Sequence, residues 1–138
     1  MKPRSVYFIV LSATMLLCTL FSFQKKPAFD LKASIARGKE VYVAYCISCH
    51  MEEGNGIENV YPPLAKSDYL MADKKRSIQQ VLYGTDEEMR VNSKIYKAPM
   101  TGFELTDEQA SDVVNYIRNS WGNKGGAVRP EEVKAARK

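Results

Sequence analysis

Two cysteines and a histidine stand together in this chain: Cys46 and Cys49 are separated by two residues, and His50 follows directly. The pattern C-x-x-C-H is typical of covalent attachment of a c-type haem. Two thiols one helical turn apart can form thioether bonds to the two vinyl groups of one porphyrin, and the following imidazole can reach the iron as the proximal ligand. The sequence therefore predicts one haem c, bound covalently through Cys46 and Cys49, with His50 on the iron.

Two other uses of the cysteines fit less well. A structural zinc site needs four ligands, but His50 is the one histidine in the chain and the third cysteine, Cys18, lies in an apolar N-terminal segment. A redox dithiol is expected beside a βαβ pattern, and no run of strands is indicated. Both alternatives are therefore disfavoured.

The N-terminal segment looks like a leader. Lys2 and Arg4 precede an uncharged apolar stretch over residues 6–23, which is typical of an export signal or an uncleaved anchor. A lipid on Cys18 is a second way, after the uncleaved anchor, to hold the protein at a membrane. Haem c is attached on the outer side of the cytoplasmic membrane, so we expect a periplasmic protein, with residues 1–23 as signal or anchor and 24–30 as a spacer.

The remaining length and charge fit one small domain. The chain has 138 residues and a formal net charge of +4, of which Lys2 and Arg4 contribute two. So mild a charge argues against nucleic acid as a partner. The basic run 74–76 is interpreted as a solvated helix face, with docking as the alternative. We expect one haem domain over 31–138, with a short extension from about residue 123, that is a monomer when free.

The hydrophobic pattern predicts an all-α domain. Capping and periodicity predict helices over 31–45, 67–71, 74–83 and 106–121, and a short amphipathic turn from Pro130. The first helix is expected to bury Leu31, Ile35, Tyr42 and Tyr45, with Gly38 on the same face. Residues 52–64 and 85–101 are predicted to be loops, the second of which wraps the haem.

The sixth iron ligand is expected to be a methionine, because no second histidine exists. Met51 adjoins the proximal ligand, Met71 lies on a core helix, and Met89 lies in an acidic, solvated stretch. Met100 is different, since Pro99 and Gly102 hold it in a loop between two helices. A His/Met pair suits an electron-transfer haem, so Met100 is the predicted ligand.

The chain from Leu31 to its C-terminus resembles the small bacterial class I cytochromes c. The resemblance rests on motifs spread over the chain: Gly38 and Tyr42 before the haem motif, Pro62-Pro63-Leu64, residues 91–107, Val113 and Tyr116 as the helix contacts of Gly38, and residues 115–123. Within this family the chain is similar to the modules that accompany periplasmic dehydrogenases and oxidases.

This resemblance implies a fold of three to five helices with loops wrapped around one haem. It implies that the Pro62 carbonyl accepts the proton of the proximal imidazole, that Leu64 belongs to the haem-binding element and that Met100 ligates the iron. Thr101-Gly102 follows Met100 where members often carry two prolines, which predicts a looser loop. By position, Arg90, Asn92 and Tyr96 are candidates for the haem propionates.

A six-coordinate haem has no position for a substrate, so the expected function is electron transfer and not enzyme catalysis. We expect a carrier of single electrons between periplasmic or membrane redox proteins, and the alternative is a relay subunit of a larger dehydrogenase or oxidase complex. A peroxidase-like haem with an open distal side is a further alternative. Ile47, Tyr61 and Phe103 are candidates for a docking patch, although aromatic and apolar residues more often pack in a core.

Overall fold

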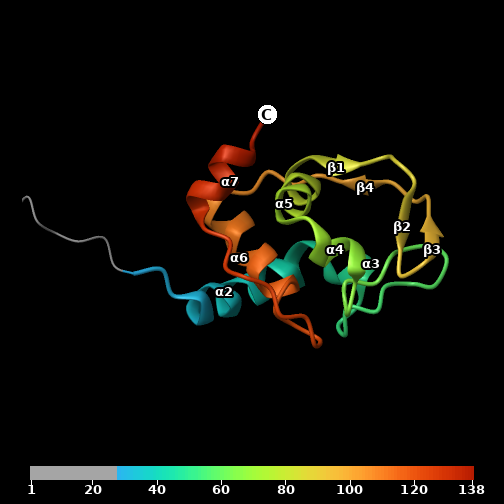
Figure 1. Cartoon of the computed structure of the whole chain (residues 1–138), viewed down its shortest axis with the longest axis horizontal. Helices are drawn as coiled ribbons and strands as arrows, with labels where there is room; N and C mark the ends of the chain where they lie inside the picture. The colour runs from blue at the N-terminus through green and yellow to red at the C-terminus, as the bar shows by residue number, and fades with distance from the viewer. Residues whose placement is uncertain (1–27) are drawn as a thin grey trace, which may run out of the picture.

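The computed structural model describes residues 28–138, and the predicted leader 1–23 with Cys18 lies outside them. The described part is mainly helical, with both strand pairs at one end and the helices α2, α6 and α7 at the other (Figure 1). Its six helices are α2 (Leu31–Tyr45), α3 (Ile47–His50), α4 (Asp68–Ala72), α5 (Lys74–Tyr83), α6 (Asp107–Ile117) and α7 (Pro130–Ala136). This number of helices exceeds the expected three to five because the short segment with the haem motif forms a helix of its own.

Helix α2 has the predicted bounds and lies directly against α6. Its start is fixed locally, because the Asp30 carboxylate accepts a hydrogen bond from the Ala33 amide at 3.1 Å. A Cβ added at Gly38 would lie 1.9 Å from the Asp112 carbonyl oxygen and 2.8 Å from the Tyr116 Cβ. Glycine therefore lets the two backbones touch. The predicted contact with Tyr116 is confirmed, and the Asp112 backbone lies closer still.

The predicted apolar stripe of α2 is correct only in part. Tyr42 and Gly38 are buried, whereas Leu31 and Ile35 are half-buried and Tyr45 is 45% exposed. The buried face instead includes Ser34, which donates to the Asp112 carboxylate at 2.5 Å. Periodicity alone missed this face because a buried polar group replaces an apolar one.

A capping box starts α6, as predicted: the Thr106 hydroxyl accepts from the Gln109 amide at 3.2 Å, and the Gln109 side chain accepts from the Thr106 amide at 3.0 Å. The helix ends at Ile117, however, and not at the predicted Trp121. The Asn123 side chain donates to the Ile117 carbonyl at 2.7 Å, and Trp121 has a φ of 53°. A side chain from beyond the helix therefore ends it earlier than the hydrophobic pattern indicated.

The predicted loop over 85–101 contains two antiparallel strand pairs, so this expectation was wrong. β1 (Gly84–Thr85) pairs with β4 (Met100–Thr101), and β2 (Met89–Val91) pairs with β3 (Lys94–Tyr96). Asn92 and Ser93 join the second pair, and both have positive φ values of 49° and 68°. A two-residue turn of this kind matches the twist of a hairpin. The asparagine was the available signal, although the usual glycine is missing.

The C-terminal segment belongs to the core. Val128 and Val133 are fully buried and Ala136 is 4% exposed, so α7 packs on α5 and α6 (Figure 1). Arg137 adds a polar clamp, because its guanidinium donates to the Asp107 carboxylate and to the Leu105 carbonyl, each at 2.7 Å. None of the helices within residues 28–138 has the length and apolar character that crossing a membrane requires.

Candidate functional site

A cavity of about 370 Å³ lies between α3, α4, α5 and the strand pairs. It brings together all six residues that the sequence placed at the haem: Cys46, Cys49, His50, Pro62, Leu64 and Met100. Its walls are largely apolar, with Val81, Val113 and Ile117 contributed by α5 and α6. Residues from distant parts of the chain therefore converge on one cavity.

The two thiols are held one helical turn apart at the start of α3. The Cys46 amide donates to the Tyr42 carbonyl at 2.9 Å, which continues α2 to the haem motif, and the Cys49 amide donates to the Cys46 carbonyl at 3.2 Å. Both cysteines are half-buried free thiols. Burial, with a smaller effect from the neighbouring Cys49, raises the pKa of the Cys46 thiol to about 12. The pair is thus positioned for covalent attachment by backbone geometry.

His50 is buried, and its ring has one defined partner. Its Nδ1 lies 3.0 Å from the Pro62 carbonyl oxygen, which is the contact that the resemblance implies. A carbonyl can only accept, so Nδ1 carries the proton and Nε2 keeps its lone pair. Burial lowers the pKa of His50, and the Pro62 contact opposes that shift. The result is a neutral imidazole whose Nε2 is available to a metal.

Two glycines in the predicted loop 52–64 position the segment that joins His50 to Pro62. Gly56 donates its amide to the His50 carbonyl at 3.0 Å, and a Cβ added there would lie 2.6 Å from the Pro62 carbonyl oxygen. The Gly54 carbonyl accepts from the amides of Leu64 and Ala65 at 2.7 and 2.9 Å. Both glycines have a φ of 64°, a backbone conformation that residues with a side chain rarely adopt. Their signal in the sequence was the Gly-x-Gly spacing directly after the haem motif.

The strand pairs form another wall of the cavity. Met100 contributes from β4, and Met89 and Val91 contribute from β2. The sequence placed Met89 in a solvated stretch, and the structure contradicts this: Met89 is half-buried and lines the cavity. Met51 and Met71 do not line it. The signal for Met89 was the alternation of β2, which places residues 89 and 91 on one face.

The residues suggested by position for the haem propionates do not line the cavity. Arg90 and Asn92 are exposed, and Tyr96 is buried elsewhere. The polar groups that do line it include Tyr61, Ser67, Tyr69 and Gln80. Among the suggested docking residues, Ile47 packs against the core, and Tyr61 and Phe103 line the cavity. All three side chains are half-buried.

The donor set fits a covalently attached haem. Two free thiols one turn apart, an imidazole with an available Nε2 and a thioether face one largely apolar cavity. Sulfur and imidazole are ligands that iron in haem accepts.

Comparison with known proteins agrees with this chemistry. A sequence model of the cytochrome c family matches residues 35–121. Cytochrome c-552 from Thermus thermophilus is 35% identical over 112 residues, which cover 74% of this chain and 85% of that protein.

Other relatives are subunits of dehydrogenases. The cytochrome c subunit of a quinone alcohol dehydrogenase from Gluconobacter oxydans is 34% identical over 103 residues, 72% of this chain. The gluconate 2-dehydrogenase cytochrome c subunit of Pantoea cypripedii is 34% identical over 105 residues, 73% of this chain. The chain spans only 22% and 24% of those two subunits. From the family match and the site together, we conclude that the chain belongs to the cytochrome c family of electron-transfer proteins and carries a haem c bound through Cys46 and Cys49.

Proposed function

We propose that this protein carries single electrons between redox proteins in the periplasm or at the membrane, with His50 and Met100 as the two axial ligands of its haem. The observation that carries the proposal is the convergence of both cysteines, His50 and Met100 on one cavity. Haem c, when bound there, supplies a one-electron couple.

Each residue of the site has a separate task. Cys46 and Cys49 hold the cofactor covalently, and Pro62 keeps the His50 ring in one tautomer and one orientation. The apolar walls from Val113 and Ile117 exclude water. Neutral imidazole and thioether ligands in such surroundings favour the less charged ferrous state, which raises the reduction potential.

Protein ligands at both axial positions leave no position for a substrate, so we infer no catalytic activity for this domain. A peroxidase-like haem needs an open distal side, and Met100 and Met89 both line the cavity where that opening would be. The two interpretations therefore differ in whether an added small ligand reaches the ferrous iron.

The test uses the full-length, haem-loaded protein. For the carrier, the ferric form is expected to show the weak far-red charge-transfer band of a thioether bound to haem iron, and the ferrous form to bind carbon monoxide slowly. Met71→Leu should give the same spectra as the unmodified chain, because Met71 is half-buried outside the cavity. A high-spin ferric spectrum with rapid binding of carbon monoxide would reject the carrier in favour of an open haem.

A second candidate is a relay subunit of a dehydrogenase complex. The relatives from Gluconobacter oxydans and Pantoea cypripedii favour it, because both are cytochrome c subunits of dehydrogenases. For a relay subunit, residues 1–23 would serve as an anchor or Cys18 would carry a lipid. For a free carrier, residues 1–23 are a signal that is cleaved, and the spacer 24–30 and the domain 31–138 follow it.

Extraction with mild detergent followed by size-exclusion chromatography distinguishes the two. Haem absorbance that elutes with dehydrogenase activity supports the relay subunit. Haem absorbance at the size of a monomer in the soluble periplasmic fraction supports the carrier.

A further inference from the structure

Two thioethers, and not one, face the cavity that contains His50. Met100 reaches it from β4 and Met89 reaches it from β2. Among residues 28–138 the other two methionines, Met51 and Met71, do not line it. A methionine side chain is flexible, with three rotatable bonds and a polarisable sulfur, so either sulfur can adapt to a metal within its reach.

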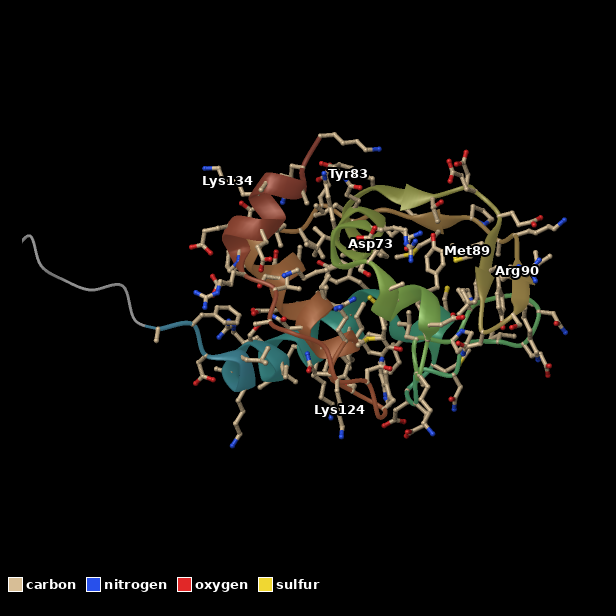
Figure 2. All side chains as sticks on the ribbon, viewed as in Figure 1. Asp73, Tyr83, Met89, Arg90, Lys124 and Lys134 are labelled. Carbon is tan, nitrogen blue, oxygen red and sulfur yellow. The ribbon has the colours of Figure 1, made fainter. Side chains whose placement is uncertain are left out.

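Strand pairing holds Met89 on the cavity side. Met89 and Val91 line the cavity, whereas Arg90 between them is exposed and donates to the Ser93 carbonyl at 3.2 Å. Figure 2 shows Met89 on the side of β2 toward the helices and Arg90 on the other side. Residue 89 also pairs in register with Tyr96, which is 4% exposed. The Met89 thioether therefore belongs to the wall of the cavity that the strand pairs form.

The backbone at Met100 is held firmly. A Cβ added at Gly84 would lie 2.0 Å from the Met100 carbonyl oxygen, and one added at Gly102 would lie 2.5 Å from the Leu82 carbonyl oxygen. The Phe103 amide donates to the Val81 carbonyl at 3.1 Å. β4 is thus anchored to the end of α5 on both sides of Met100, as suits a resident ligand.

The backbone at Met89 is held through the hairpin turn. Asn92 exchanges two hydrogen bonds with Asp68, at 3.1 and 2.8 Å, and Lys94 pairs with Glu58 at 2.6 Å. Residues 86–88, which connect β1 to β2, are exposed. β2 is therefore anchored at its turn, while the connection that precedes Met89 lies in solvent.

We propose that Met89 is a reserve ligand of the haem iron, which takes the sixth position when Met100 leaves it. The proposal rests on the proposed function, in which Met100 is the resident ligand. The exchange breaks one sulfur–iron bond and forms another of the same kind, and no proton or electron is transferred. The site then stays closed to outside ligands while the loop around Met100 is displaced.

The experiment compares four full-length, haem-loaded proteins: the unmodified chain, Met89→Leu, Met100→Leu and the double variant. Their ferric far-red spectra and the carbon monoxide affinity of their ferrous forms are measured. We expect the thioether band in the unmodified chain, in Met89→Leu and in Met100→Leu, and its loss in the double variant. Carbon monoxide should bind Met100→Leu at least about tenfold more weakly than the double variant, because the reserve ligand reduces the fraction of open sites.

The outcomes separate this proposal from the function on which it rests. Loss of the band in Met100→Leu, with carbon monoxide affinity equal to that of the double variant, overturns the reserve role and leaves the carrier intact. If Met89→Leu loses the band and Met100→Leu keeps it, Met89 is the resident ligand and both assignments are overturned. A band that survives in the double variant also overturns both assignments. A missing band in the unmodified chain overturns the closed carrier itself.

Met100→Ala repeats the comparison where leucine interferes with haem loading, since it adds no new bulk to the wall. Met71→Leu serves as the control for the substitution as such and should leave both measurements unchanged, because residue 71 does not line the cavity.

Discussion

The helical end of the molecule and its strand end hold the cavity in different ways. At the helical end, α2 and α6 touch backbone to backbone at Gly38, and Asp112, 3% exposed, joins them through Ser34 and Arg37. At the strand end, pairs of two and three residues are joined by exposed connections, and Ile95 on β3 is 43% exposed. The helical end is therefore held by buried contacts, whereas the strand end has connections that are exposed to solvent.

This difference matches the two sides of the cavity. His50 follows α2 of the tightly packed end, and its ring is fixed by the Pro62 carbonyl at 3.0 Å. The thioethers of Met89 and Met100 are attached to the strand end. Because the packed end has no room to relax, we expect changes there to reduce the stability of the whole fold, and changes at the strand end to affect ligation first.

The largest effect is expected from Gly38→Ala. The added Cβ would lie 1.9 Å from the Asp112 carbonyl oxygen, so α2 and α6 must separate. We expect a loss of about 3 kcal/mol in the free energy of unfolding, at the upper end for overpacked cores. Guanidinium unfolding of the haem-loaded protein measures it. Gly126→Ala is the control, since a Cβ at Gly126 has no neighbour within 4 Å; equal stabilities for the two variants would show that the helices yield easily.

Asp112→Ala should reduce the free energy of unfolding somewhat less, by about 2 kcal/mol, because it leaves the buried Ser34 hydroxyl without its acceptor and removes the partner of the half-exposed Arg37. The Asp112 carboxylate accepts from Ser34 at 2.5 Å and from Arg37 at 2.7 and 2.8 Å, and this contact raises the pKa of Arg37. Glu108→Ala removes only an exposed partner of Arg37 at 3.5 Å and should cost well under 1 kcal/mol. The same unfolding experiment compares the two, and similar losses would argue that the carboxylate acts through surface charge alone.

Gly102→Ala tests the strand end. Its added Cβ would lie 2.4 Å from the Tyr83 carbonyl carbon, so the segment with Met100 must move. We expect a loss of only about 1 kcal/mol in global stability, but thermal loss of the far-red thioether band well before the helices unfold. Absorption and circular dichroism recorded during one temperature ramp measure both. A band that disappears together with the helical signal would show that the two ends unfold as one unit.

The smallest loss in the free energy of unfolding is expected when an ion pair at either end is removed. A hydrogen bond from Lys74 lowers the pKa of Glu132, so the folded state favours the charged carboxylate. The stabilisation is therefore present at neutral pH and is lost as the pH falls through that lowered pKa. Because Glu132 is 37% exposed, Glu132→Gln should cost less than about 1 kcal/mol at neutral pH.

The measurement is the free energy of unfolding of Glu132→Gln and the unmodified chain across the acid range, where the two curves should converge. Glu88→Gln is the counterpart at the strand end, where Glu88 pairs with Lys97 at 3.1 Å and both side chains are more than half exposed. Its cost should be smaller still. A larger loss for Glu88→Gln would reverse the order expected for the two ends.

The sequence predicted the helices well wherever a local signal sets their ends. Asp30 caps α2, Gly84 with a φ of 72° ends α5, and Thr106 opens α6 through its capping box. Each signal acts within four residues, so no knowledge of the fold is needed. The end of α6 escaped prediction because Asn123, six residues further on, determines it.

The sequence by itself determined the chemistry of the haem motif and the helices on either side of it, and it predicted a methionine as the sixth ligand. Only the tertiary structure decided that β1 pairs with β4, that Met89 shares the cavity with Met100 and that the C-terminal helix α7 belongs to the core. The reason is physical: caps and helical periodicity act between near neighbours, whereas strand pairing and cavity walls join residues far apart in the chain, whose meeting depends on how the whole domain packs.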